Sequence, residues 1–241
     1  MIPLDIDRLR RAFPSRAIHY YPTIDSTMTA AASLPFGDVV LAEEQTAGQG
    51  RHGHTWHSAA GDGIYCSLVL PQSPLLTLAL GLATHSAIFE ATGLVCDLRW
   101  PNDLMLSGRK VAGILVQAAG RNAIAGIGIN VNHTVFPEDV AALATSLRIE
   151  RGQRRVIPRE DILLALLPAI DAIVPQDGSV ILAAFTQLSS YASGRRVQVE
   201  QPDGVVTGIT AGLNPDGYLV VRRDDGTDTL IVAGGVRAAR S

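Results

Sequence analysis

The feature that most constrains this chain is one long apolar segment in its first half. Residues 74–92 read PLLTLALGLATHSAIFEAT, are apolar nearly all round, and are followed by Gly93. This length favours a helix over a strand, and glycine is preferred just past a helix end. A helix without a polar face has to be covered on every side. We therefore expect a buried helix over 74–92 that backs a sheet.

Short segments rich in β-branched residues supply the strands of that sheet. The last two candidates are joined by Gly120-Arg-Asn, which suits a hairpin. Residues 159–173 and 180–188 resemble two further helices. The sequence thus predicts an α/β or α+β sheet domain over residues 1–188. Its candidate strands are 38–43, 64–70, 94–100, 111–118 and 123–131.

Beyond Ser189 the pattern changes to short strands separated by tight turns. The turns are Pro-Asp-Gly at 202–204, Asn-Pro-Asp-Gly at 214–217 and Asp-Asp-Gly at 224–226. Turns this close together indicate a small β-barrel-like module over residues 189–241. The module holds as many arginines as acidic residues, and this neutral balance disfavours an RNA-binding barrel.

Composition excludes several classes of protein. A hydrophobic content of 47% argues against general disorder, and a net charge of -3 gives no basic field to attract nucleic acid. No uninterrupted apolar run approaches the roughly 18 residues of a membrane helix, and the N-terminus is charged where a signal peptide needs an apolar core. We expect a cytoplasmic protein without DNA or membrane partners. Cys66 and Cys96 stand alone and are interpreted as small buried hydrophobes.

Lysine usage is the sharpest compositional signal. Of 20 basic residues, Lys110 is the only lysine. In a chain that otherwise uses arginine, this lysine marks a candidate site for a compact ammonium, although chance could also leave one lysine.

Three segments carry candidate chemistry. The first, Thr46 to Trp56, follows a strand and contains three glycines with Arg51 and two histidines. Such a loop lets backbone N–H groups approach an anion, and the alternative is an ordinary surface loop. It is not the dinucleotide fingerprint, since no helical pattern opens at its end, and the chain has no Walker A motif.

The second segment, residues 99–115, reads as the end of a strand, a turn and a new strand that begins near Lys110. Asn102 and Asp103 lie at the turn. As a carboxylate, Asp103 is a candidate Mg²⁺ ligand, and Lys110 could neutralise a phosphate or carboxylate beside it. The alternative is that Asn102 and Asp103 only cap a turn.

The third segment, Gly126 to Asn132, places glycines inside an apolar strand. Glycines there weaken a strand, so they indicate close approach of a ligand or simply tight sheet packing.

Five segments then occur in order: Asp25-Ser-Thr, Glu43-Glu-Gln-Thr-Ala-Gly-Gln-Gly-Arg-His-Gly, Arg99-Trp-Pro-Asn-Asp-Leu, Gly108-Arg-Lys-Val-Ala-Gly-Ile-Leu and Gly126-Ile-Gly-Ile-Asn-Val-Asn. Together they resemble the biotin protein ligases, also called biotin–[acetyl-CoA-carboxylase] ligases, from about residue 20 to the end. The resemblance implies an α+β catalytic domain like that of class II aminoacyl-tRNA synthetases and biotin–lipoate ligases. It also implies a C-terminal SH3-like barrel that includes Gly234-Gly-Val-Arg.

The implied reaction makes biotinyl-5′-AMP from biotin and ATP with Mg²⁺, and then biotinylates a lysine of biotin carboxyl carrier protein. By position, Lys110, Arg51 and Asp103 are the implied catalytic residues, with Asp103 as the Mg²⁺ ligand. Lys110 would bridge the biotin carboxylate and the α-phosphate, so that one cation offsets the repulsion of two anions. The implied biotin contacts are Ser26, Thr27, Gln45, Gly48, Gln49, Gly50, Arg51, Lys110, Gly113 and Gly126. The implied ATP or adenylate contacts are Arg51, His52, Gly53, Trp56, Asn102, Lys110 and Asn130.

The chain departs from the family's common pattern at four positions. Gln49 and His54 replace arginines, Arg99 replaces a lysine, and Met28 replaces a frequent asparagine. The loop is therefore less cationic than usual. Only 24 residues precede Asp25, which predicts a monofunctional ligase without a DNA-binding domain, either monomeric or homodimeric. Two alternatives stay open: a lipoate or octanoate ligase on the same fold, and a biotin-binding module without turnover.

Overall fold

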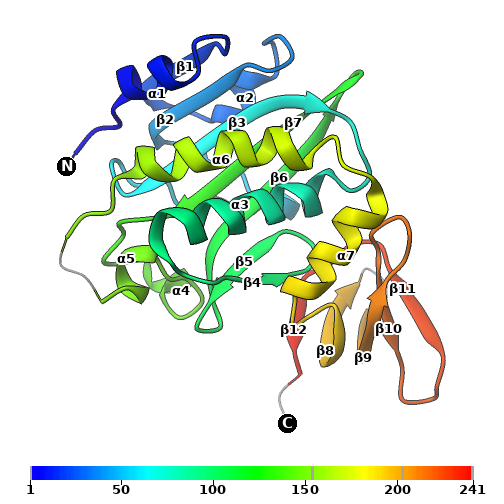
Figure 1. Ribbon diagram of the computed structural model, residues 1–241. Helices are drawn as coiled ribbons and strands as arrows, with labels where there is room; N and C mark the ends of the chain where they lie inside the picture. The colour runs from blue at the N-terminus through cyan, green and yellow to red at the C-terminus, as the bar shows by residue number, and fades with distance from the viewer. Residues whose placement is uncertain (1, 153–154, 202–203, 240–241) are drawn as a thin grey trace.

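A seven-stranded mixed sheet forms the centre of the larger domain in the computed structural model (Figure 1), which describes residues 2–152, 155–201 and 204–239. Its strand order is β1-β2-β3-β7-β6-β5-β4, with β1 and β2 parallel and every other pair antiparallel. The strands are β1 (Ile18–Ile24), β2 (Val39–Gln45), β3 (Gly63–Pro71), β4 (Asp97–Arg99), β5 (Asp103–Leu106), β6 (Arg109–Ala119) and β7 (Asn122–Asn130).

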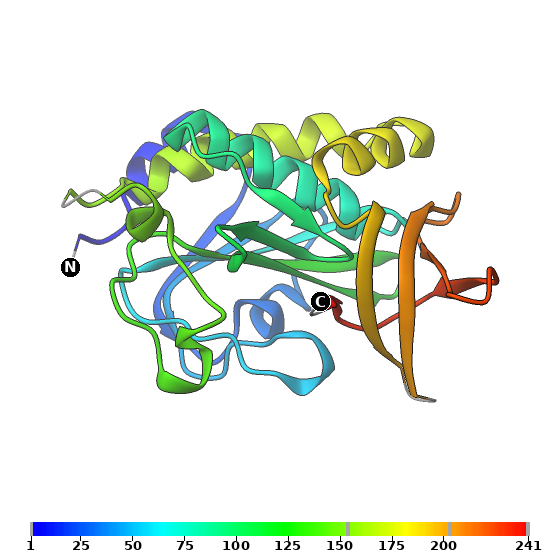
Figure 2. The ribbon, with the colours of Figure 1, turned by 90° about the horizontal axis from the view of Figure 1, so that it is seen from below.

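The long helices lie on one face of this sheet, and the short helix α2 (Thr27–Ala31) lies on the other (Figure 2). The predicted apolar helix is α3 (Leu76–Thr92); it ends at Gly93, whose φ of 74° is the left-handed conformation that glycine adopts without strain. Helix α6 (Arg159–Ile173) packs against α3 and covers it. The remaining helices are α1 (Ile6–Ala12), α4 (Glu138–Ala141), α5 (Leu147–Glu150) and α7 (Gly178–Leu188), with a 3₁₀ turn η1 at Arg51–Gly53.

The C-terminal module is an antiparallel five-stranded sheet of order β11-β10-β9-β8-β12. The predicted all-β module is confirmed, but among the described residues its ladder does not close into a barrel. Trp100 donates its indole N–H to the carbonyl of Gly217 at 2.9 Å, which ties the module to the larger domain. The boundary between residues 188 and 189 stays a prediction. The strands are β8 (Ser193–Gln201), β9 (Gly204–Leu213), β10 (Leu219–Arg222), β11 (Asp228–Ile231) and β12 (Val236–Ala238).

The predicted elements differ from the structure in several places, and the short helices α1, α2, α4 and α5 were not predicted. The segment 94–100 holds only the short strand β4, because the Pro101-Asn102 turn reverses the chain and starts β5, which the sequence did not predict. Strand β1 was also missed. The predicted turn at Pro202-Asp203 lies outside the described residues. The hairpin of β6 and β7 is confirmed, with Gly120-Arg121 at its tip.

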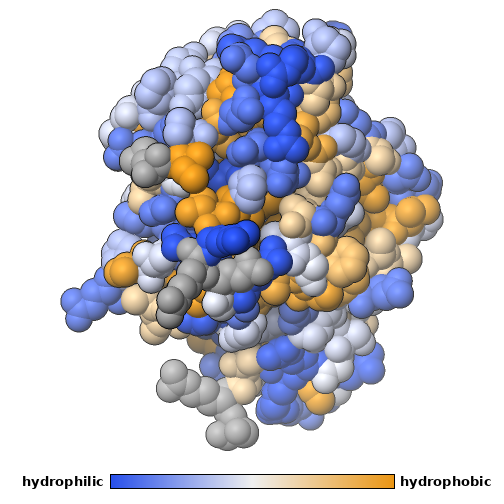
Figure 3. Space-filling view, turned by 60° about the vertical axis from the view of Figure 1, so that its left-hand side comes forward, coloured by the Kyte–Doolittle hydropathy of each residue, from blue (hydrophilic) through white to orange (hydrophobic). Residues whose placement is uncertain are grey.

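The molecular surface mixes hydrophilic and hydrophobic residues, as the composition of the chain predicts. Hydrophilic and hydrophobic side chains are interspersed over the face that Figure 3 shows. In the described ranges no helix has both the length and the apolar character to cross a membrane.

Candidate active site

A cavity opens where α2 and the 46–56 loop cover the sheet, and most of the predicted site residues line it. It encloses about 450 Å³, part of which is open to solvent. Segments distant in sequence meet here because α2, β2, β6 and β7 lie close together in the fold. The predicted residues on its lining are Thr27, Gln45, Gln49, Gly50, Arg51, Trp56, Asn102, Lys110, Gly113 and Gly126.

Six predicted residues do not line the cavity. His52 and Gly53 lie at the exposed tip of the loop, and Gly48 lies at its base. Asn130 is buried and donates its amide to the carbonyl of Thr145 at 3.1 Å. The other two, Ser26 and Asp103, lie directly beside lining residues. The hydroxyl oxygen of Ser26 is buried without a hydrogen-bond partner among the described residues.

A satisfied polar cluster holds Gln45 at one end of the cavity. Its side-chain oxygen accepts hydrogen bonds from the Thr27 amide at 2.8 Å and the Thr27 hydroxyl at 3.0 Å. Its amide nitrogen donates to Ser58 Oγ at 2.9 Å, and Ser67 donates to Thr27 Oγ1 at 2.8 Å. Because these groups are already mutually oriented, the ordering cost on ligand binding is small.

The glycines of β6 and β7 are required by close approach of side chains. A Cβ at Gly126 would lie 2.5 Å from the sulfur of Met28, and one at Gly128 would lie 2.4 Å from the Trp56 ring. A Cβ at Gly113 would lie 2.8 Å from Lys110 Nζ. These distances are too short for a real Cβ, so the glycines that the sequence singled out leave room for the side chains of the site.

The glycine loop is a narrow tongue of residues 48–56. Gly50 donates its amide to the carbonyl of His54 at 2.7 Å, and Trp56 donates to Gly48 at 2.9 Å. The tip turns at His52, whose φ is 56°. Arg51 extends from the tongue to Asn102 Oδ1 at 3.0 Å, so that the tongue and the Pro-Asn-Asp turn meet over the cavity. Burial lowers the pKa of Arg51, and Asp103 partly offsets this.

Lys110 is positioned by a bulge in the hairpin of β5 and β6. The register shifts there: Leu104 pairs with Ala112, while Met105 pairs with Lys110. One extra residue in β6 re-aims the neighbouring side chain, as bulges do near functional sites. Lys110 Nζ then lies 2.6 Å from Asp103 Oδ1 and 5.2 Å from the centre of the Trp56 ring.

Asp103 is clamped between two cations. Its second oxygen accepts a hydrogen bond from Arg99 at 2.5 Å. Burial raises the pKa of Asp103, but the charges and hydrogen bonds of Lys110 and Arg99 outweigh burial and hold that pKa below its ordinary value. The carboxylate is therefore ionised and serves as the counterion that orients Lys110.

A preformed Mg²⁺ site does not fit this arrangement. Both oxygens of Asp103 already face cations, and the described residues contain no group of three His, Cys, Asp or Glu side chains that could hold a metal. The predicted role of Asp103 as a Mg²⁺ ligand therefore finds no support in its contacts.

Replacing Asp103 by Asn tests the counterion role. We expect at least a 10-fold loss of adenylate formation, because a hydrogen bond to a charged group contributes about 1.5–3 kcal/mol and its loss frees Lys110. The Mg²⁺ concentration for half-maximal rate should stay unchanged. A Mg²⁺ titration of both enzymes, with thermal melts to check folding, measures this. A large increase in the Mg²⁺ requirement would instead show a metal ligand.

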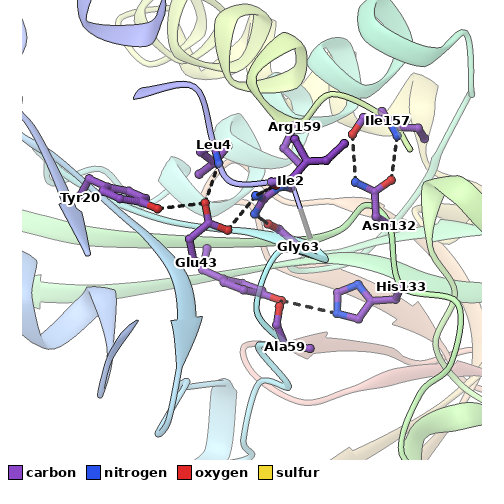
Figure 4. Close-up of polar contacts among 11 residues, drawn as sticks. Ile2, Leu4, Tyr20, Glu43, Ala59, Gly63, Asn132, His133, Ile157 and Arg159 are labelled. Atoms are coloured by element: carbon purple, nitrogen blue, oxygen red, sulfur yellow. Dashed lines mark hydrogen bonds and ion pairs between the residues drawn. The ribbon is translucent and has the colours of Figure 1, made fainter. Parts of the chain in front are cut away.

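Two residues outside the predicted set hold the strand that leads into the tongue. Figure 4 shows Glu43 on β2 between Arg159, which donates to Glu43 Oε2 at 2.7 Å, and the backbone amide of Leu4, at 2.6 Å from Oε1. Arg159 also donates to the carbonyls of Gly63 and Ile2. Glu43 was in a quoted motif, but its partner lies 116 residues away and no local signal connects them.

Comparison with known proteins identifies the class. Residues 20–133 match the model of the Biotin/lipoate A/B protein ligase family, and residues 192–236 match the Biotin protein ligase C terminal domain. The mixed sheet with its lysine-lined cavity and the all-β module thus define a protein ligase of this class.

Individual relatives narrow the class. The chain is 32% identical to the bifunctional ligase/repressor BirA of Bacillus subtilis, over 89% of this chain and 72% of that protein. It is 35% identical to the biotin–[acetyl-CoA-carboxylase] ligase of Mycobacterium tuberculosis, over 83% and 77%. The structure matches the Aquifex aeolicus biotin protein ligase solved in complex with biotin and ATP, with a TM-score of 0.83, 29% identity, and 93% of this chain and 99% of that one covered. The chain belongs to the biotin protein ligase family.

Proposed function

We propose that this chain is an ATP-dependent biotin protein ligase whose first half-reaction depends on Lys110. The observation that carries this is the ammonium of Lys110, held by Asp103 in the cavity that also presents Gln45 and Arg51. A carboxylate of biotin attacks the α-phosphorus of ATP, the bond from that phosphorus to the β-phosphate oxygen breaks, and pyrophosphate leaves with those electrons.

The residues divide this task by position. The cluster of Thr27 and Gln45 lies on the cavity lining, and the second amide N–H of Gln45 and the second lone pair of Thr27 Oγ1 remain for the polar ring of biotin. Lys110, on the cavity lining, is proposed to neutralise both the carboxylate and the phosphate, and Arg51, which reaches from the tongue to Asn102, is proposed to contact the phosphate. Cations placed where charge develops stabilise the transition state without reorganisation.

In the second half-reaction the ε-amine of an acceptor lysine attacks the acyl carbon of biotinyl-5′-AMP. The acyl–phosphate bond breaks, AMP leaves, and the amine loses a proton. We propose biotin carboxyl carrier protein as the acceptor. Mg²⁺ enters the proposal as an ion carried by the ATP phosphates, since it commonly keeps most of its waters and few protein ligands. We further propose a cytoplasmic enzyme, acting as a monomer or homodimer.

A lipoate or octanoate ligase is the alternative on this fold. A route through an acyl-cysteine would need a reactive thiol near Lys110, and the candidate is Cys66 on β3, which lines the same cavity. Burial raises the pKa of Cys66 to about 12, so the thiol is protonated and a poor nucleophile. This favours direct transfer from an adenylate.

The deciding experiment is ATP–pyrophosphate exchange with biotin or lipoate as the acid. We expect exchange that depends on biotin and is absent with lipoate. Exchange with lipoate alone would identify the alternative ligase, and biotin binding without exchange would identify a binding module.

The tongue gives a second test of the site. Three glycines give it a large conformational entropy, which contacts with bound anions offset. We expect tryptic cleavage after Arg51 to slow at least several-fold when biotin and ATP are added. Cleavage at exposed Arg121, on the β6–β7 hairpin, serves as the internal control. Equal cleavage rates at Arg51 with and without ligands would contradict ligand-induced ordering.

A further inference from the structure

The β5–β6 hairpin carries Lys110 and is bound by a carboxylate from another element, that of Glu150 on α5. Ser107 donates its hydroxyl to Glu150 Oε2 at 2.6 Å, and Arg109 donates to Oε1 at 2.8 Å. Thr145 donates its hydroxyl to Oε1 at 2.5 Å. Only 10% of the Glu150 side chain is exposed. One partly buried carboxylate thus connects the β5–β6 turn, the start of β6 and the segment before α5.

One of these partners, Thr145, also holds the main chain of Lys110. Its amide donates to the carbonyl of Leu143 at 2.8 Å, and its carbonyl accepts from the amide of Thr145 at 2.9 Å. The segment 143–145 therefore pairs with Lys110 as a short parallel bridge. Thr145 holds the lysine through its backbone and holds Glu150 through its hydroxyl, so the two sets of contacts form one network.

The turn of this hairpin needs such support. Ser107 has a φ of 50°, a left-handed conformation that is unfavourable for a residue with a side chain. Its hydrogen bond to Glu150 stabilises that conformation. Burial raises the pKa of Glu150, but the hydrogen bonds from Ser107, Thr145 and Arg109 lower it by more. The net pKa therefore lies below the ordinary value of a glutamate.

We infer that Glu150 is a positioning residue for Lys110: it sets where the β5–β6 hairpin holds the ammonium, and it does not itself touch the substrates. This rests on the proposed function. A side chain that has to reach two anions tolerates little displacement of its own backbone, since a shift of about 1 Å can cost on the order of 100-fold in rate.

Replacing Glu150 by Ala removes all three hydrogen bonds. We expect kcat for biotin-dependent pyrophosphate exchange to fall roughly 10- to 100-fold, with the KM for ATP changed much less. Glu150→Gln is the conservative variant. Its oxygen can still accept from Arg109 and Thr145, and the Ser107 hydroxyl can turn to accept from the new amide. The Gln enzyme should therefore stay within about 3-fold of wild type.

A double-mutant cycle separates positioning from general destabilisation. Biotin affinity is measured by calorimetry for Glu150→Ala alone and in the Lys110→Ala background. We expect the single variant to weaken binding roughly 10-fold and to have no further effect once the ammonium is gone. Asp224→Ala, which breaks the exposed pair with Arg196 on the other module, is the matched control and should change neither value. Equal weakening in both backgrounds would overturn the inference.

A second route keeps the test decisive if Glu150→Ala does not fold. The variant Ser107→Ala/Arg109→Ala removes the two hydrogen bonds that join the hairpin to Glu150 and should give the same pattern in the cycle. Hydrogen exchange of the Lys110 and Thr145 amides gives a readout independent of turnover, and we expect both to exchange faster in either variant. Unchanged hydrogen exchange of these amides would reject the positioning role. Absence of biotin-dependent ATP–pyrophosphate exchange in the wild-type enzyme would reject the proposed function instead.

Discussion

Replacing Lys110 by Arg should abolish most adenylate formation, almost as completely as replacement by Ala. The Ala variant loses a charge-assisted contact that contributes about 1.5–3 kcal/mol to ligand binding. It loses about 2.7–4 kcal/mol in the transition state, where one preorganised donor changes the rate on the order of 100- to 1,000-fold. Biotin-dependent ATP–pyrophosphate exchange measures both effects.

The geometry explains why Arg should fail although it keeps the charge. The ammonium lies 2.6 Å from Asp103 and stacks over the Trp56 ring, and even a Cβ at Gly113 would approach it to 2.8 Å. A planar guanidinium is broader than an ammonium and donates in a rigid fork. In this space it would have to displace either the tongue or Asp103.

The control is the same kind of change at a solvent-exposed site. Arg121→Lys exchanges one cation for another at the tip of the β6–β7 hairpin and should leave exchange activity unchanged. Wild-type activity in the Lys110→Arg enzyme would contradict the proposed mechanism. Lys110 would then be only a solvated lysine at the start of a strand.

Local sequence patterns predicted the elements whose signals are local. Helix α3 was predictable because its residues are apolar on every side and Gly93 ends it. The hairpin of β6 and β7 was predictable from its turn residues. Much of the cavity lining was predictable from five short motifs, since each motif falls on an element that reaches the cavity.

Contacts between distant segments were not predictable in the same way. The sequence singled out Lys110 and Asp103, but not the bulge that aims the lysine nor the pairing of Lys110 with residues 143–145. Strand β1 was missed because it is partly buried and pairs with only one neighbour, which leaves an apolar pattern too weak to recognise. Such features depend on which segments the fold brings together, and a single sequence does not contain that information in local form.

The ion pair of Glu43 and Arg159 is the long-range contact with the largest expected effect on stability. Their side chains are only 7% and 2% exposed, and the pair ties the N-terminal segment and the start of α6 to β2. Removing one partner leaves a buried charge without compensation, which costs about 3–5 kcal/mol. For a chain of this size that lowers the melting temperature by about 6–20 °C.

We therefore expect Arg159→Met and Glu43→Gln each to destabilise strongly in thermal and urea unfolding. The double variant should lose less free energy of unfolding than the sum of the two single variants. Each single variant leaves one buried charge without its partner, and the double variant leaves none. Some cost must remain, since the amide of Leu4 and the carbonyl of Gly63 lose charged partners in the double variant. Asp171→Asn, which weakens the more exposed pair with Arg16, is the matched control and should change stability by less than about 1 kcal/mol. Strictly additive losses in the double variant would mean that Glu43 and Arg159 stabilise the fold independently, and that their pairing does not hold β2 beneath the tongue.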